Sequence, residues 1–414
     1  MKVKAFRGLR PAEKYASRVA SRPYDVLDSN EARKEAEGNP YSFLNVAKPE
    51  ITLPAETDPH SQIVYDAGRD NFNKLVKDGI FLQDEGDRLY IYELTMNGHA
   101  QTGIVACAWI DDYLQDRIRK HELTRPDKEA DRKNHIRISM MNAEPVLFAY
   151  KWTKELDDII NDVKLNEPEY DFVADDGISH KLWIITDELL MNNIIQNFSK
   201  MQFTYVADGH HRSAAATLVG CDFRNENSGH TGSEEYNYFL AVYFSDNQLQ
   251  IQDYNRVIRD INGHTPDSFI DEISKSFSVK KMGKLAYRPG KLHEMGMYLD
   301  GVWYSLTATP GIYDDSDPIA VLDVTILSEY ILKPVLDIQD LRTDKRIEFV
   351  GGIRGLGELE RRVDSGEMAI AFAMYPVSMK QLMDIADNGL IMPPKVTWFE
   401  PKLRSGLIVH SLLD

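Results

Sequence analysis

Residues 204–220, TYVADGHHRSAAATLVG, are the stretch from which the fold is best predicted. Thr204–Ala207 are typical of a β-strand, Asp208 and Gly209 of a turn, and Ser213–Val219 of a helix that ends at Gly220. The strand and the helix therefore bring the turn to a helix N-terminus. Free backbone N–H groups and the positive end of the helix dipole favour an anion such as phosphate at that position.

The side chains of this turn are suited to phosphate chemistry. Arg212 carries a fork of N–H donors, and Gly209 lets the backbone approach a ligand closely. His210 and His211 are the side chains whose ordinary pKa lies near neutrality. A turn followed by a helix cap explains Asp208 and Gly209 alone, but two histidines and an arginine on a loop favour a binding or catalytic role.

Composition restricts the class of protein. The chain has 414 residues, of which 43% are hydrophobic, so two or more domains are expected. A net charge of −17 and the lack of a long apolar run predict a cytoplasmic protein that binds neither nucleic acid nor membrane. Two cysteines, Cys107 and Cys221, are too few for a disulfide framework. Composition leaves the oligomeric state open.

The pattern of strands and helices predicts an α+β fold with mixed sheets and flanking helices, because strands outnumber the crossovers of a parallel sheet. The domains expected are residues 1–265, which carry the 208–212 turn, and residues 266–414, which end in a loop that returns to the site. The main elements expected are a hairpin over 88–110 turning at Asn97-Gly98, a helix over 111–122, helices over 151–164 and 188–199, a hairpin over 238–252, strands over 302–306, 345–350 and 368–375, and a helix over 378–387.

Three further segments are rich in reactive side chains. In Arg22–Glu31, Asp25 and Glu31 are candidate acids, bases or metal ligands, although a turn and a capped helix explain the segment equally well. His121–Arg132 is a mixed-charge run, which favours a solvent-exposed face. The prolines in Met392–Leu407 make a helix unfavourable and predict a stiff loop that contains Trp398 and Phe399. The cations of this loop can bind an anion: Lys395, Lys402 and Arg404.

Four motifs taken together resemble a known family. PYDV near the N-terminus, ADGHHRSAA in the middle, NYFLAVYF with YNRVI after it, and MPPKVTWFEPKLRSG near the end are similar in sequence and order to domain-of-unknown-function family 1015. The 208–212 turn also resembles the phosphate-binding box of the ParB/sulfiredoxin-like fold, a group that includes kinases of free L-serine. The longer spacing here implies such an element carrying a large insertion.

This second resemblance implies roles for individual residues. Asp208, Gly209, His210, His211 and Arg212 would contact a nucleotide or substrate phosphate, and an early acidic residue, Glu31 or otherwise Asp25, would accept the serine hydroxyl proton. In this hypothesis Asp208 and Asp25 hold Mg²⁺, and ATP or ADP is the phosphate donor. The phosphate charge is neutralised by three cations: Lys395, Lys402 and Arg404. We therefore expect Arg22–Asp25, Asp208–Arg212 and Lys395–Arg404 to converge on one cleft.

Three alternatives remain at this stage. The same groups serve hydrolysis of O-phosphoserine or another phosphomonoester as well as phosphorylation of serine. A nucleotide-binding regulator without turnover would use the same pocket. A hydrolase holding a transition metal through His210, His211 and nearby carboxylates is the third alternative, although adjacent histidines chelate one ion poorly and no HExxH motif is present.

Overall fold

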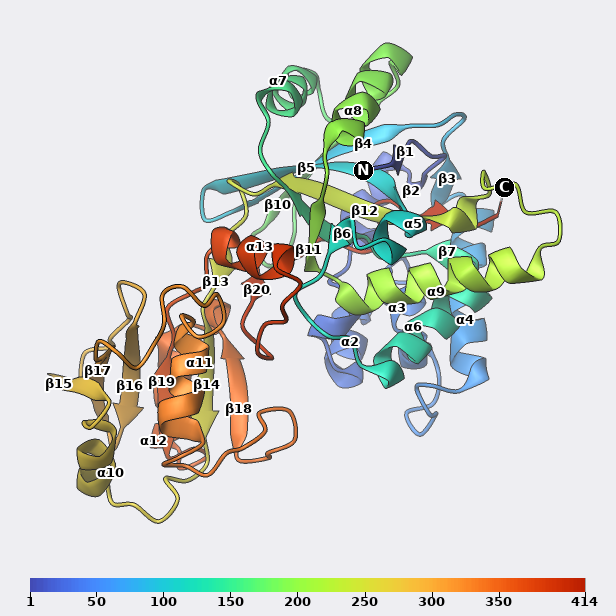
Figure 1. Cartoon of the computed structure of the whole chain (residues 1–414). Helices are drawn as coiled ribbons and strands as arrows, with labels where there is room; N and C mark the ends of the chain where they lie inside the picture. Colours follow the sequence, from blue (N-terminus) through green and yellow to red (C-terminus); the bar gives the residue numbers. More distant parts are fainter. Residues whose placement is uncertain (414) are drawn as a thin grey trace. The chain divides into compact units, whose positions relative to one another are not determined.

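The computed structural model describes residues 1–413, which form two compact units. The first unit comprises Met1–Leu249 and the C-terminal tail from Pro401, and the second comprises Gln250–Glu400. The boundary expected at 265/266 falls inside the second unit, because β14 (Tyr254–Ile258) already pairs with β18 (Ile347–Gly351) and β19 (Ile370–Ala373). Mixed sheets with flanking helices confirm the predicted α+β class (Figure 1).

A mixed sheet forms the framework of the first unit. Its strand order is β6-β11-β8-β12-β5-β4-β10-β9, and β1 also pairs with β5. The sheet pairs parallel strands at β6·β11 and β8·β12 and antiparallel strands elsewhere. The strands are β1 (Val3–Lys4), β4 (Leu89–Met96), β5 (His99–Trp109), β6 (Ile118–Arg119), β8 (Val146–Tyr150), β9 (Tyr170–Val173), β10 (Ser179–Ile185), β11 (Thr204–Asp208) and β12 (Tyr238–Ser245).

Helices cover this sheet and complete its core. Figure 1 shows α6 and α9 side by side, with α7 and α8 together in a separate group. Phe148, Val206 and Phe198 are buried in the main apolar cluster, where alternate strand positions meet the helices. The helices are α1 (Ala16–Val19), α2 (Ser29–Ala36), α3 (Leu44–Ala47), α4 (Gln62–Lys77), α5 (Ile110–Leu114), α6 (Pro126–Ser139), α7 (Lys154–Val163), α8 (Glu188–Lys200) and α9 (His210–Glu226).

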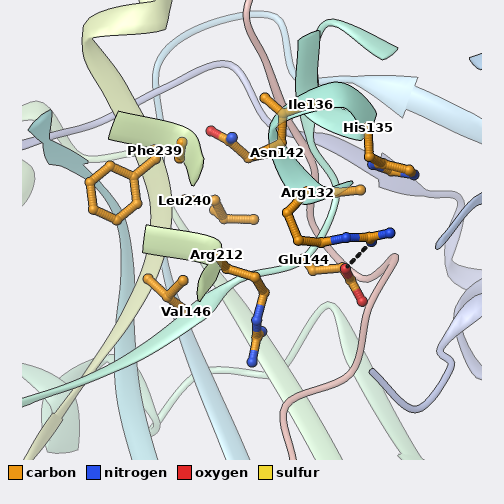
Figure 2. Close-up of a pocket in the computed structure, with 11 residues that line it drawn as sticks. Arg132, His135, Ile136, Asn142, Glu144, Val146, Arg212, Phe239 and Leu240 are labelled. Carbon is orange, nitrogen blue, oxygen red and sulfur yellow. Dashed lines mark ion pairs between the residues drawn. The ribbon is translucent and has the colours of Figure 1, made fainter. Parts of the chain in front are cut away.

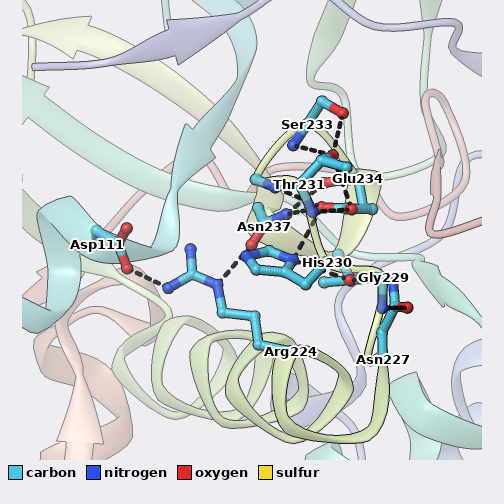
Figure 3. Close-up of polar contacts among 11 residues, drawn as sticks. Asp111, Arg224, Asn227, Gly229, His230, Thr231, Ser233, Glu234 and Asn237 are labelled. Atoms are coloured by element: carbon cyan, nitrogen blue, oxygen red, sulfur yellow. Dashed lines mark hydrogen bonds and ion pairs between the residues drawn. The ribbon is translucent and has the colours of Figure 1, made fainter.

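Helix α9 does not end at Gly220, as the sequence predicted, but continues to Glu226. A Cβ atom on Gly220 would lie 2.4 Å from the Tyr236 carbonyl oxygen and 2.6 Å from Ile110 Cδ1, so this glycine permits close packing rather than a stop. Beyond Gly220, Arg224 donates to Asn237 at 2.5 Å and to Asp111, which fixes the C-terminal half of the helix (Figure 3).

One prediction around residues 111–132 was wrong and another holds in part. The helix expected to reach Glu122 ends at Leu114, and β6 follows it at Ile118–Arg119. The charged run is exposed or half-buried from Arg125 to Ala130, but Asp131 and Arg132 are buried: they pair at 2.8 Å, and the guanidinium lies 4.0 Å from the centre of the Tyr24 ring. Paired charge and a cation–π contact offset the cost of burying the guanidinium.

The second unit is built on an antiparallel sheet with the strand order β15-β17-β16-β19-β14-β18. The strands not yet given are β15 (Phe277–Gly283), β16 (Glu294–Leu299) and β17 (Val302–Ala308), and the helices are α10 (Pro266–Ile273), α11 (Asp323–Leu327), α12 (Leu356–Asp364) and α13 (Met379–Asp387). Short pairs complete the chain: β13 (Ile251–Gln252) with β20 (Trp398–Phe399), β2 (Leu9–Pro11) with β3 (Phe81–Gln83), and β7 (Met141–Asn142) with β21 (His410–Ser411). Within residues 1–413 we find no helix with the length and apolarity needed to cross a bilayer.

Candidate phosphate-binding site

The N-terminus of α9 lies directly after strand β11. Gly209 links them in a left-handed conformation (φ 98°), in which a Cβ would lie 3.0 Å from Val146 Cγ1 and 3.2 Å from Arg212 Cζ. The helix begins at His210, three residues before the predicted start, so the two histidines and Arg212 form its first turn. Among the described residues, no side chain caps this end. The first backbone N–H groups lack carbonyl partners within the helix, which makes this end suited to an anion.

Charged side chains from three distant segments meet beside this turn. Arg212 lies 3.1 Å from the Asp208 carboxylate and 3.9 Å from that of Asp25, and Lys402 lies 3.7 Å from Asp208. Burial alone would raise the pKa of Asp208, but the charges of Lys402 and Arg212 outweigh it and lower this pKa to about 2. The carboxylate is therefore ionised across the physiological range. Tyr24–Asp25, the 208–212 turn and Lys402 occupy one neighbourhood of the first unit.

Arg212 is held more firmly than its predicted role in ligand binding requires. Its side chain is 8% exposed, and besides Asp208 it donates to the Pro145 carbonyl oxygen. Burial disfavours its charge, but Asp25, Asp208 and Glu144 together raise its pKa. Its Nε makes no hydrogen bond within the described part of the chain. Arg212 thus supports the loop and also keeps one donor for further use.

Behind Arg212 a small cavity reaches between α6 and α9 (Figure 2). Arg132, Glu144 and Arg212 form its polar side, with Arg132 Nη1 3.6 Å from Glu144, and Phe239 and Leu240 lie among its apolar residues. Glu144 also accepts from the Tyr24 backbone at 3.0 Å and from Ser405 at 3.1 Å. The space, about 20 Å³, suffices for a single water molecule, so it is not the place for a nucleotide.

The two adjacent histidines point to different surroundings. His211 is partly exposed and accepts a hydrogen bond of 3.1 Å from the backbone of Arg125. His210 is buried, and its ring lies edge-on to His121 with 4.4 Å between centroids. Burial lowers the pKa of His121 to about 4 and that of His210 well below its usual value, so both rings are neutral at physiological pH.

His121 was predicted at the end of a helix, at the start of a charged run expected to face solvent, and it is buried instead. Strand β6, which precedes it, pairs in parallel with β11, with Ile118 opposite Thr204 and Arg119 opposite Tyr205. Parallel neighbours end at the same edge of a sheet, so the residues after β6 and after β11 lie together. A two-residue strand carries too little periodicity to be recognised from sequence.

The remaining predicted site residues have other partners. Glu31 is exposed, and its carboxylate accepts from the Asp28 backbone at 2.9 Å in the capping box of α2. Arg404 is 4% exposed and pairs with Asp176, while its Nε donates to His180 at 3.2 Å. Lys395 belongs to the second unit, where its ammonium lies 5.8 Å from the centre of the Tyr254 ring.

Comparisons with known proteins give a family and several similar folds. A family model described as protein of unknown function, DUF1015, matches residues 3–325. No protein of curated function matches significantly. Similar solved structures include a free serine kinase variant in complex with AMP (TM-score 0.37, 11% identity, 73% of this chain and 92% of that chain) and SbnI with a C-terminal truncation from Staphylococcus aureus (0.40, 12%, 73% and 85%). A conserved hypothetical protein from Pyrococcus furiosus is similar at TM-score 0.36 and 13% identity, over 74% of this chain and 95% of that chain.

Proposed function

The chain belongs to the DUF1015 family of proteins of unknown function, and from that starting point we propose that it is an enzyme of phosphoryl transfer. Its substrates would be a small hydroxyl compound and a nucleotide phosphate donor, in the manner of a kinase. The observation that carries the proposal is the uncapped N-terminus of α9, beside which Asp25, Asp208, Arg212 and Lys402 converge.

The N-terminus of α9 and the charged side chains beside it supply what phosphoryl transfer needs. Such transfer depends on positioning and on neutralising phosphate charge more than on covalent participation of the protein. The first-turn N–H groups of α9 bind phosphate oxygens, and Lys402 adds a cation that is 15% exposed. Gly209 has no side chain to obstruct the approach.

Two carboxylates are available for the metal and the proton. Asp208 and Asp25 are 31% and 41% exposed and face the same guanidinium, so both remain accessible to Mg²⁺, which prefers carboxylate oxygens. We assign Mg²⁺ to Asp208 and the acceptance of the hydroxyl proton to Asp25, in preference to Glu31, because Glu31 caps α2. When held there, Mg²⁺ would supply positive charge that offsets the charge of the phosphate.

The decisive assay offers the protein a donor and an acceptor separately. Protein with Mg²⁺ is incubated with L-serine plus ATP or ADP, and in parallel with O-phosphoserine alone, while phosphoserine and phosphate are followed by mass. L-Serine is the first acceptor because the 208–212 segment resembles the phosphate-binding box of free-serine kinases. Formation of phosphoserine supports the kinase, and release of phosphate in the second mixture supports the phosphatase alternative.

Variants connect any activity to the site. Lys402→Met should weaken nucleotide binding about 10-fold or more, since a hydrogen bond to a charged group contributes about 1.5–3 kcal/mol. Lys154→Met, an exposed lysine of α7 paired with Asp158, is the matched control and should bind as wild type does. Asp25→Asn should abolish turnover and Glu31→Gln should retain it. Inert protein that still binds nucleotide tightly would replace the proposal with the regulator alternative.

A further inference from the structure

A second group of side chains lies at the buried side of the same helix end. His121 and Glu122 follow β6, and His210 is the first residue of α9. One ligand atom from each of the three residues lies within 4.8 Å of the other two, and His210 Nδ1 lies 4.0 Å from a Glu122 carboxylate oxygen.

The histidines of this group are buried and under-satisfied. His121 is 1% exposed, and within residues 1–413 its ring reaches only the backbone of Val206, so at least one of its two ring nitrogens lacks a hydrogen-bond partner. His210 is 5% exposed, and its Nε2 also has no partner in the described chain. A buried polar atom left unsatisfied costs about 1–3 kcal/mol, and such atoms are rare in folded proteins. Two such atoms, one on each of two adjoining rings, point to a missing ligand.

From this arrangement we propose that His121, Glu122 and His210 bind a divalent transition-metal ion of the Zn²⁺ class. Two imidazole nitrogens and one carboxylate oxygen are the donors of three-ligand zinc sites, which keep a fourth position open. Ligand atoms around Zn²⁺ lie roughly 3.3 Å apart, from bond lengths of about 2.0–2.1 Å. The three ligand atoms lie within 4.8 Å of one another, so metal binding would draw them together by about 1–1.5 Å, and the Glu122 side chain, 46% exposed, has room to move.

The site differs from the histidine pair considered from sequence. His211 faces Arg125 and takes no part, so the second imidazole comes from another strand end rather than from the neighbouring residue. The exposed side of Glu122 leaves the open coordination position on the solvent side. This inference does not depend on phosphoryl transfer, because the carboxylates of that proposal, Asp208 and Asp25, take no part in this group.

Metal binding is tested without nucleotide or substrate. Full-length protein is stripped with a chelator and titrated with Zn²⁺ by calorimetry, and Co²⁺ is added separately to record the visible absorption of a tetrahedral complex. We expect one equivalent of Zn²⁺ and a tetrahedral Co²⁺ spectrum. Absence of stoichiometric binding by the folded wild-type protein would overturn the proposal and leave the proposed function untouched.

Variants test the ligands one at a time. Glu122→Gln should lower Zn²⁺ affinity at least about 10-fold, since even outer-shell changes cost that much. Glu155→Gln, an exposed carboxylate of α7 outside the group, should bind as wild type does. His121→Asn should lose the Co²⁺ spectrum, and a cooperative thermal transition of the metal-free variant shows that the loss is not due to unfolding. Wild-type affinity in Glu122→Gln and His121→Asn would refute this ligand set.

Discussion

Replacing Gly209 by alanine tests how the turn is held. The left-handed backbone at φ 98° costs an alanine about 1–2 kcal/mol. The new Cβ also meets Val146 Cγ1 at 3.0 Å and Arg212 Cζ and Nε at 3.2 Å, and overpacking of this kind costs about 1–3 kcal/mol. We therefore expect Gly209→Ala to lower the free energy of unfolding by about 2–5 kcal/mol.

Gly38→Ala is the matched control within the first unit. Gly38 follows α2 with φ 72°, and a Cβ added there would meet no described atom within 4 Å, so the substitution carries the backbone cost alone. Urea midpoints at constant m-value give both changes in stability, and calorimetry gives ADP affinity. Gly209→Ala should lose ADP binding because Arg212 is displaced, and Gly38→Ala should keep it. Equal destabilisation by the two variants would refute the packing argument.

Three shorter predictions follow from the same packing and charges. Arg212→Ala should destabilise the protein by about 1–3 kcal/mol, because it leaves the Pro145 carbonyl oxygen and the half-buried Asp208 without this donor. Arg125→Ala, at an arginine 69% exposed, should leave the urea midpoint unchanged. Gly220→Ala should accelerate amide exchange in α9, because the added Cβ meets the Tyr236 carbonyl oxygen. Helix propensity alone predicts the opposite, since alanine favours a helix over glycine by about 1 kcal/mol, so slower exchange would contradict the packing argument. The lowered pKa of Asp208 means that its ionised form stabilises the fold above about pH 4, by at most about 2 kcal/mol after screening at 31% exposure. This contribution is lost as the pH falls toward 2. The urea midpoint of Asp208→Asn should therefore differ from that of wild type at pH 5 and much less near pH 2.

The sequence predicted the strand–turn–helix at 204–220 because its signals are local. A β-rich run, a glycine and an alanine-rich segment follow one another, and the structure has β11, Gly209 and α9 there. The end of α9 was predicted wrongly, since the reason for Gly220 is contact with Tyr236 and Ile110, which a local pattern does not contain. Long hairpins such as β4·β5 were recognisable from Asn97-Gly98 and alternating apolar residues.

The candidate site depends on contacts between distant residues, which composition does not reveal. Lys402 reaches Asp208 across 194 positions, and the motif resemblance, rather than periodicity, suggested that the two belong together. His121 was missed because a charged run is usually solvated, and its burial follows from the parallel pairing of β6 with β11. Glu31 has the local pattern of a capping residue, and the structure gives it that contact.

The first unit is interrupted in sequence by the whole of the second, and this affects how the protein is made. Lys402, Arg404 and the strand β21 leave the ribosome after Gln250–Glu400, which takes roughly 8–30 s to synthesise at about 5–20 residues per second. During that interval the nascent first unit lacks the strand that pairs with β7 and the lysine beside Asp208. A ribosome that stops early therefore releases a chain whose second unit can be complete while the 208–212 turn of the first still lacks Lys402.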